Sequence, residues 1–190
     1  MRKRPPGKLR IIGGEHRSRI VEFDGDSGVR PTPDRVRQTV FDWLAPVIDG
    51  ARVLDLFAGS GALGLEALSR GAAHVTFVET GAQQNTLIKE ALLTLKIPHN
   101  RFDVAMMDAL YYLTQTWHRY GVVFLDPPFE TTLLQQALVE LPKILSPYNR
   151  IYLEWPEGRK PELPAGFEWL REKQAGKVCF GLATCHLEKS

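Results

Sequence analysis

The sequence is poor in cysteine and has no long apolar run. Only two of its 190 residues are cysteine, and Cys179 and Cys185 lie six residues apart in a strand-like segment. This pattern is typical of reduced core residues, and it excludes a disulfide scaffold or a Cys-x-x-Cys zinc or redox site. No segment approaches the roughly 18 apolar residues of a membrane span, and the basic residues 1–6 are not followed by the apolar core of a secretory signal. We therefore expect a soluble, cytoplasmic protein.

Positive charge is concentrated at one end of the chain. The net charge is only +2, but residues 1–40 contain ten Lys or Arg against five Asp or Glu, so this segment carries +5 and the remainder −3. A basic segment on a near-neutral body is typical of a protein that binds a phosphate backbone. Two short strands, over 12–14 and 20–23, would hold the central arginines in place. The candidate phosphate-binding residues are Arg10, Arg17, Arg19, Arg30 and Arg35.

Strand-like and helix-like segments alternate through the rest of the chain. Thr32 is expected as the N-cap of a first helix, with Pro33 at its first position. Strands are then predicted over 52–57, 74–79, 102–107, 122–126 and 150–155, separated by helices ending at 70 and spanning 83–95, 109–118 and 131–141, and two final strands over 167–173 and 177–186. Such alternation implies parallel βαβ crossovers, and the final pair implies an antiparallel edge. We predict an α/β domain over 30–190 with a seven-stranded, mostly parallel sheet, preceded by a β-hairpin arm over 1–29.

A glycine loop follows the first strand of this sheet. Gly59, Gly61 and Gly64 match G-x-G-x-x-G, which permits a tight turn, close approach of a ligand to the backbone and close packing of the next helix. Glu79 closes the next strand, twenty residues after Gly59, where a carboxylate can accept hydrogen bonds from both ribose hydroxyls. Strand, loop, helix, strand and acid in this order indicate an adenosine-containing ligand.

Asp55 favours S-adenosylmethionine over NAD as that ligand. It lies four residues before Gly59, where its carboxylate would repel a pyrophosphate but attract the ammonium and the sulfonium of a methionine moiety. Holding the loop through backbone N–H groups is compatible with this role. Asp108 ends the third strand, where it can accept from the adenine amino group or cap the next helix. Phe57 and Ser60, in the same glycine loop, complete the candidate cofactor residues.

Asp126, Pro127, Pro128 and Phe129 follow the fourth strand. In a doubly wound sheet the strand order reverses between the first and fourth strands, and ligands bind at that point, so these residues face the glycine loop. A carboxylate, carbonyls beside prolines that lack N–H groups, and an aromatic ring suit a flat exocyclic amine. Accepting hydrogen bonds from the amine aims its lone pair at a sulfonium methyl, and Asp126 can take the released proton.

The motifs together resemble one known family. The Asp-Pro-Pro-Phe segment resembles the signature of methyltransferases that act on adenine N6 or guanine N2. Segments 10–14 (Arg-Ile-Ile-Gly-Gly), 30–37 (Arg-Pro-Thr-Pro-Asp-Arg-Val-Arg) and 56–67 are similar to the RsmD family, guanine-N2 methyltransferases of bacterial 16S ribosomal RNA. The similarity runs from about Arg10 to the last strand. Ser18 stands where the arm of that family usually reads Arg-Gly-Arg, and Gly181 stands where bulkier residues are usual.

This resemblance implies a Rossmann-like S-adenosylmethionine methyltransferase fold and methylation of one guanine in the RNA of the small ribosomal subunit or its assembly intermediates. It assigns Gly59, Gly61 and Glu79 to the cofactor, residues 126–129 to the base, and the basic arm to RNA. A monomer is expected. The five histidines show no ligand spacing, so no catalytic metal is expected.

Three other functions are weighed against this one. DNA adenine-N6 methylation shares the Asp-Pro-Pro-Phe motif, but 190 residues leave little room for a separate recognition domain. A nucleic-acid-binding protein that has kept the fold without activity is disfavoured by the intact motif. A dehydrogenase is disfavoured by Asp55, and NADH binding would identify it.

Overall fold

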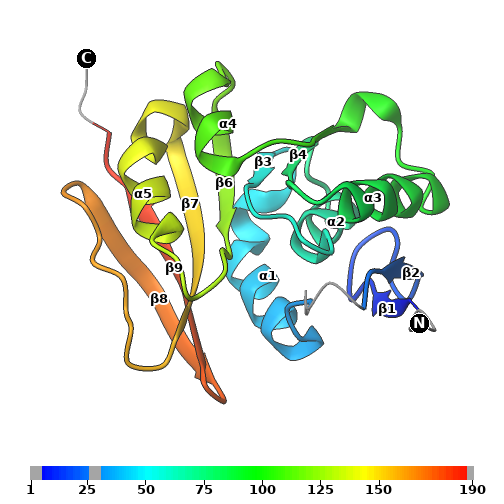
Figure 1. The fold of residues 1–190 in the computed structure, drawn as a ribbon, viewed down its shortest axis with the longest axis horizontal. Helices are drawn as coiled ribbons and strands as arrows, with labels where there is room; N and C mark the ends of the chain where they lie inside the picture. Colours follow the sequence, from blue (N-terminus) through cyan, green and yellow to red (C-terminus); the bar gives the residue numbers. More distant parts are fainter. Residues whose placement is uncertain (1–5, 26–30, 188–190) are drawn as a thin grey trace.

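The computed structural model describes residues 6–25 and 31–187. These form a two-stranded hairpin and a seven-stranded sheet covered by helices (Figure 1). The elements are β1 Gly7–Arg10, β2 Ile20–Phe23, α1 Asp34–Ile48, β3 Arg52–Asp55, α2 Ala62–Ser69, β4 His74–Val78, α3 Ala82–Thr94, η1 His99–Arg101, β5 Phe102–Ala105, α4 Ala109–Gln115, β6 Tyr120–Leu125, α5 Leu133–Glu140, η2 Leu141–Ile144, β7 Leu145–Pro156, β8 Phe167–Ala175 and β9 Val178–Cys185. Among the helices described, none is long and apolar enough to cross a membrane.

The strand order of the large sheet is β5-β4-β3-β6-β7-β9-β8. Strands β5, β4, β3, β6 and β7 are parallel, while β9 pairs antiparallel with both β7 and β8. The sequence-based prediction of a mostly parallel sheet with an antiparallel edge is confirmed. The order reverses between β3 and β6, so the carboxyl ends of these two neighbouring strands form the switch point at which such sheets bind ligands.

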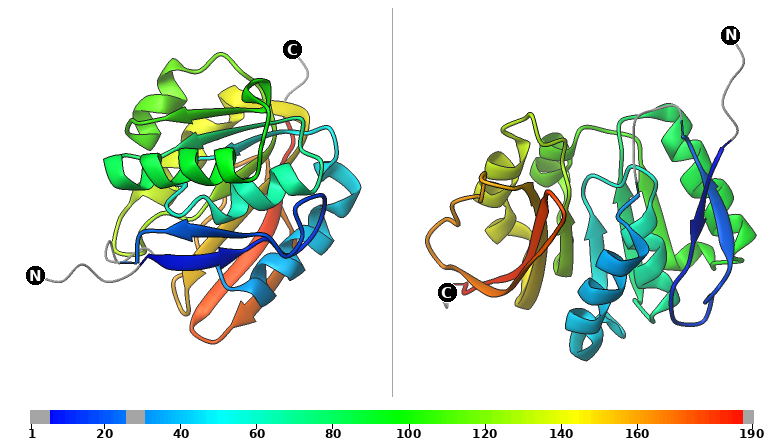
Figure 2. Two further views of the ribbon diagram at one scale, coloured as in Figure 1. Left: turned by 90° about the vertical axis from the view of Figure 1, so that its right-hand side faces the viewer. Right: turned by 90° about the horizontal axis from the view of Figure 1, so that it is seen from below.

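Two apolar layers hold the sheet between its helices. One cluster joins β3, β4 and β6 to α1, α2 and α3 and also contains Leu9, Ile11 and Val21 of the N-terminal segment. The other joins the opposite faces of the same strands to α4 and α5. Helices therefore cover both faces, as right-handed βαβ crossovers require, and the N-terminal hairpin shares the first of these cores (Figure 2).

The hairpin is anchored to α2 by a buried ion pair. Glu66 of α2 and Arg37 of α1 are both fully buried, and Arg37 Nη1 lies 3.3 Å from Glu66 Oε2. The Glu66 carboxylate also accepts hydrogen bonds from the backbone N–H groups of Ile12 and Gly13, at 2.9 and 2.8 Å, and Arg37 donates to the carbonyl of Arg10 at 3.0 Å. The arm is thus held rigidly against the sheet domain. The predicted boundary at residue 29 lies outside the described residues.

Three local predictions are wrong. Helix α1 begins at Asp34 with Pro33 as its N-cap, because the hydroxyl of Thr32 donates to a buried carboxylate instead of capping the helix. The first arm strand spans Gly7–Arg10 and not 12–14, because residues 11–19 form the turn of the hairpin, with Ser18 at φ +68°. The helix predicted over 109–118 ends at Gln115, because Thr116 is extended.

Gly181 is explained by the antiparallel edge. Strand β8 has a register shift between Trp169 and Arg171 where it pairs with β9. A Cβ atom on Gly181 would lie 2.8 Å from the Arg171 carbonyl oxygen and 2.8 Å from the Trp169 ring. The missing side chain therefore makes room for this bulge and for the ring, which packs against Trp155 with ring centroids 5.0 Å apart. The free cysteines, Cys179 half-buried and Cys185 buried, are core residues as predicted.

Candidate active site

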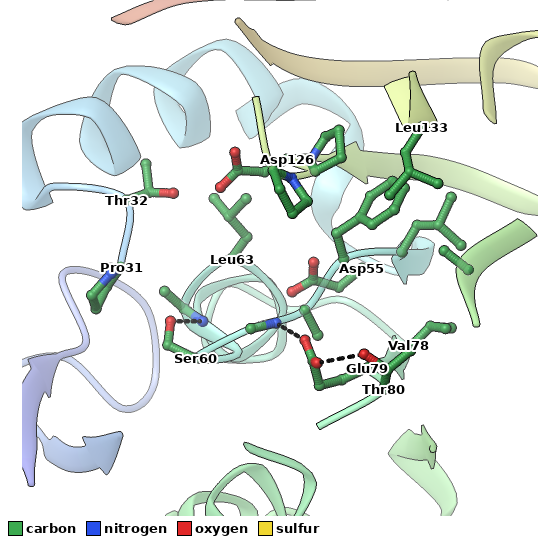
Figure 3. A pocket seen from close by; sticks show the side chains of 18 of the residues that line it. Pro31, Thr32, Asp55, Ser60, Leu63, Val78, Glu79, Thr80, Asp126 and Leu133 are labelled. Atoms are coloured by element: carbon green, nitrogen blue, oxygen red, sulfur yellow. Dashed lines mark hydrogen bonds between the residues drawn. The ribbon is translucent and has the colours of Figure 1, made fainter. Parts of the chain in front are cut away.

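A cavity of about 690 Å³ lies at the switch point. It is formed by the carboxyl ends of β3, β4 and β6, the loops that follow them, and the segment that precedes α1 (Figure 3). Of the eleven residues predicted for cofactor and base, all except Gly61 line it. They are Asp55, Phe57, Gly59, Ser60, Glu79, Asp108, Asp126, Pro127, Pro128 and Phe129. The fold thus brings both motifs to one site.

The glycine loop has the backbone geometry that its sequence predicts. Gly59 and Gly61 adopt left-handed φ angles of +53° and +76°, which side chains rarely tolerate. The N–H group of Gly61 donates to the Ala58 carbonyl at 2.7 Å and closes the turn. A Cβ atom on Gly64 would lie 2.2 Å from the Phe77 ring of β4, so close packing of α2 on the sheet requires glycine there.

Glu79 holds the two loops on either side of it. One carboxylate oxygen accepts from the N–H of Gly59 and the other from the N–H of Gly81, both at 2.8 Å. Figure 3 shows Glu79 beside the glycine loop on the wall of the cavity. The oxygen that accepts from Gly81 also accepts from the Thr80 hydroxyl at 3.4 Å. Because each carboxylate oxygen has two lone pairs, the oxygen bonded to Gly59 can still accept a hydrogen bond from a ligand.

Asp55 is an acid that forms no ion pair with the Lys, Arg or His residues that the structure describes. Its side chain is buried, and one oxygen accepts from the N–H of Gly64 at 3.0 Å. Burial raises the pKa of this carboxyl to about 7, the charge of Glu79 adds to the rise, and the Gly64 hydrogen bond opposes it. A positively charged group entering the cavity would stabilise the ionised form.

Asp126 follows β6, and its carboxyl points toward Thr32 (Figure 3). Burial holds the pKa of Asp126 well above its ordinary value, and the nearby carboxylates of Glu154 and Asp55 raise it further. Pro127 and Pro128 continue the wall, and the Phe129 ring is 37% exposed. The motif therefore presents a half-buried acid next to an accessible aromatic face.

Sequence reasoning missed Glu154, near the end of β7. One of its oxygens accepts from the hydroxyl of Tyr152 at 2.6 Å and from the hydroxyl of Thr32 at 3.1 Å. Burial raises the pKa of Glu154, and its hydrogen bonds with Tyr152, Thr32 and Asp126 oppose the rise. No local motif marks this residue. The one feature of the sequence that points toward Glu154 is the segment 30–37, because its Thr32 donates to the Glu154 carboxylate.

The comparisons with known proteins identify the family of this chain. The family model described as Conserved hypothetical protein 95 matches residues 9–184. Ribosomal RNA small subunit methyltransferase D of Escherichia coli is 44% identical over 179 residues, which cover 93% of this chain and 89% of that protein. The protein of the same name from Haemophilus influenzae is 40% identical and covers 93% of each chain. The chain belongs to the RsmD family.

A solved methyltransferase structure from Escherichia coli has the same fold as this RsmD-family chain. It superposes with a TM-score of 0.86 at 40% identity, over 96% of this chain and all of that one. The predicted fold class is therefore confirmed, including the antiparallel edge and the N-terminal hairpin.

In this RsmD-family chain, Asp108 is the N-cap of α4. One of its oxygens accepts from the N–H of Tyr111 at 2.9 Å. This is one of the two roles that the sequence left open. Asp108 also lines the cavity, so its second oxygen remains able to accept a hydrogen bond from a ligand.

The candidate RNA-binding arginines differ in how firmly they are held. Arg10 forms an ion pair with Asp34 at 3.0 Å, and Arg19 donates to the Thr94 carbonyl at the end of α3, also at 3.0 Å. Arg17 and Arg35 are exposed. Arg30 lies outside the described residues. Arg10 and Arg19 are thus fixed by the body of the protein, while Arg17 and Arg35 face solvent.

Proposed function

We propose that the protein transfers a methyl group from S-adenosylmethionine to the exocyclic N2 amine of a guanine in 16S ribosomal RNA, as a cytoplasmic monomer. The observation that carries this proposal is one cavity lined by both the glycine loop and Asp126 to Phe129, in a chain of the RsmD family. The substrate is the small ribosomal subunit or an assembly intermediate of it.

The residues of the cavity fit the cofactor. S-adenosylmethionine, when bound, supplies a methyl group on a positively charged sulfur. The Glu79 oxygen that accepts from Gly59 keeps a lone pair for a ribose hydroxyl, and Asp108 keeps one for the adenine amino group. Asp55 is buried and has no ion pair within residues 6–25 and 31–187, so it suits the ammonium of the methionine moiety. A dinucleotide pyrophosphate would add negative charge beside buried carboxyls, which argues against NAD.

Asp126 and Phe129 suit the target base. The Asp126 carboxyl and the carbonyls next to the two prolines can accept from the N–H groups of an exocyclic amine, while the exposed Phe129 ring stacks on the base. These contacts position the nitrogen lone pair for in-line transfer. A base inside structured RNA must leave its stack to reach this cavity, and the basic arm binds the surrounding phosphates.

Methyl transfer with nucleoside analysis tests the proposal. Labelled S-adenosylmethionine is mixed with small ribosomal subunits that lack the modification, with naked 16S RNA and with duplex DNA. We expect N2-methylguanosine from the ribosomal substrate alone. N6-methyladenine in DNA would refute the family's substrate for this chain while keeping the reading of Asp126 to Phe129, and a saturable cofactor complex without transfer to any substrate would refute catalysis.

Replacing Asp126 tests its role in the chemistry. In Asp126→Ala the acceptor for the amine is lost, so turnover should fall by at least 100-fold, as for other groups that position a reactant. Cofactor affinity, measured by calorimetry, should change little. Glu130→Gln is the matched control, because Glu130 is four residues further along, 86% exposed and paired only with Arg159 at the surface. Full activity in Asp126→Ala would contradict the assignment.

A further inference from the structure

Glu154 and Asp126 meet because of strand register. Leu125 of β6 pairs with Leu153 of β7 in the parallel sheet, so the residues that follow them lie side by side at the carboxyl edge. Neighbouring in-register positions of parallel strands direct their side chains to the same face. The register therefore places the two carboxyls next to each other, where they interact. One carboxyl can donate a hydrogen bond to the other only if it carries a proton.

The surroundings of this pair are acidic. Asp55 of β3 faces Asp126, Tyr152 of β7 and Thr32 face Glu154, and Asp126 faces Glu154. In the part of the chain that the structure describes, none of the ion pairs formed by Lys, Arg or His involves Asp55, Asp126 or Glu154. Asp55 and Asp126 thus line the cavity with Glu154 beside Asp126, and among the described residues that line the cavity none is Lys, Arg or His.

The two hydroxyl groups decide where the shared proton resides. Tyr152 and Thr32 both donate to the same oxygen of Glu154, and hydrogen bonds of this kind stabilise the ionised form of the acceptor. No hydroxyl group among the described residues donates to Asp126 in this way, so Asp126 holds the proton and donates it to Glu154. In that protonated state, Asp126 is a poor acceptor for the N–H groups of a target amine.

We propose that Asp126 and Glu154 hold one proton between them while the cavity contains no cation, and that they release it when the sulfonium of the cofactor enters. Glu154 is a positioning residue that acts through Asp126. The inference rests on the proposed function, because it names S-adenosylmethionine as the ligand. It adds that the positive charge of the cofactor converts Asp126 into the carboxylate that accepts the target amine.

The elevated pKa values of both carboxyls agree with this coupling. Burial is the largest cause for each, and the neighbouring charges add to the rise in the pKa of Asp126. A positive charge in the same cavity acts in the opposite direction and lowers the pKa of Asp126. Binding of a cation in the cavity should therefore release the proton that Asp126 and Glu154 share.

The charge of the site then stays balanced through the reaction. The lone pair of the amine forms the new C–N bond as the C–S bond breaks, and the electrons of the C–S bond go to sulfur, which becomes neutral. The nitrogen, which carries the positive charge after transfer, loses a proton to Asp126. The pair is protonated again, and the neutral product leaves a site that no longer favours a cation.

Calorimetry with two ligands tests this coupling without any turnover. S-adenosylmethionine and S-adenosylhomocysteine differ in the methyl group and the sulfur charge, so effects of their shared ammonium cancel. Titrations from pH 6 to 8.5 in two buffers of different ionisation enthalpy count the protons exchanged. We expect about one more proton released by S-adenosylmethionine, and an affinity ratio of the two ligands that rises about tenfold per pH unit where the pair titrates.

Substitutions of Glu154 and of its donor Tyr152 should shift the pH window of proton release in opposite directions. Glu154→Gln keeps an acceptor for Tyr152 and Thr32 but removes the charge beside Asp126, so the window in which the extra proton is released should shift to lower pH. Tyr152→Phe removes a donor that stabilises ionised Glu154, so the window should shift to higher pH. Glu157→Gln is the control, because Glu157 is exposed and three residues further along, and it should leave the proton count unchanged.

The outcomes separate the two proposals. If neither ligand binds saturably to protein that melts cooperatively, the proposed function fails. If both bind but release equal numbers of protons, or if Glu154→Gln leaves the window in place, the proton-sharing pair is refuted while the methyltransferase assignment stands. An unchanged window in Glu154→Gln would instead assign the proton to Asp55.

Discussion

At the scale of single residues, the site is built from acids placed where they are costly to ionise. Asp55 is 3% exposed, and its pKa of about 7 lies far above the ordinary value of 3.8. Such a group contributes little to folding when the cavity is empty, because burial opposes its charge. Under the proposed function, a ligand that brings a positive charge would stabilise the ionised form, so the residue would serve binding at the expense of stability.

Asp55→Asn should therefore change how stability depends on pH. The folded protein binds a proton at Asp55 between its unfolded pKa near 3.8 and its folded pKa near 7, so the free energy of unfolding of the wild type falls as pH rises through this window and stays low above it. The variant lacks this fall. Between pH 5 and pH 8, urea unfolding should show the variant gaining about 3 kcal/mol relative to the wild type. An equal difference at both pH values would contradict the elevated pKa.

Ser18 adopts a backbone conformation that is unfavourable for a residue with a side chain. Its φ of +68° lies in the left-handed region, and its N–H group donates to the Ile11 carbonyl at 2.8 Å. Ser18→Gly should stabilise the protein by about 0.5–1 kcal/mol, because glycine adopts this φ without strain. Chemical denaturation measures the difference. Ser18→Ala is the control, since it keeps the strain and should bring no gain.

At the scale of elements, the arm is a rigid carrier of positive charge. The hairpin of β1 and β2 is fixed by Glu66 and Arg37, and β2 packs near α3. Arginines on a fixed hairpin lose little conformational entropy when they bind phosphates, in contrast to arginines on a disordered tail. Arg17 is exposed in the turn between β1 and β2, so it is the clearest candidate for a phosphate contact.

Arg17→Ala should weaken RNA binding in a salt-dependent way. Loss of one phosphate contact should reduce the slope of log Kobs against log salt by about 0.7–0.9, while cofactor affinity stays unchanged. Filter binding of 16S RNA at several salt concentrations gives the slope. Lys143→Ala in η2 removes one exposed positive charge from the other half of the sheet, so an equal effect there would show that the arm is not the RNA contact.

At the scale of the whole molecule, the arm is not an appendage. Leu9 and Ile11 are 3% and 0% exposed and belong to the same core as α1, α2 and α3. The turn after them is equally close-packed, because a Cβ atom on Gly14 would lie 1.9 Å from the Ser69 carbonyl oxygen. The two predicted units, 1–29 and 30–190, therefore share one apolar layer.

Deleting residues 1–19 should destabilise the entire protein. The deletion exposes the apolar surface that Leu9 and Ile11 cover, at about 1.5–3 kcal/mol each, and removes two hydrogen bonds to the buried Glu66. Together these losses approach the full stability of a typical domain. Urea unfolding followed by circular dichroism checks this. A truncated protein with unchanged stability and cofactor affinity would show that the arm is an independent unit.

Much of the site could be predicted because its motifs are contiguous. Gly59 to Gly64 and Asp126 to Phe129 combine special backbone geometry with chemistry in a few adjacent residues, and the alternation of strands and helices places both at the switch point. Ten of the eleven predicted residues line the cavity for this reason. The parallel sheet and its antiparallel edge also follow from local patterns, since periodicity and the lack of a final helix are visible in the sequence.

Only the tertiary structure decided the contacts between distant residues. Thr32 and Glu154 are 122 positions apart, and Glu154 meets Asp126 through the register of β6 and β7, which no local pattern encodes. The same holds for the pair of Arg37 and Glu66, charged residues that local patterns assign to helix surfaces. Their burial depends on how the hairpin, α1 and α2 pack together. The sequence by itself thus determined which motifs form the candidate site. The packing of distant elements determined that Glu154 lies beside Asp126, where the two acids can share a proton.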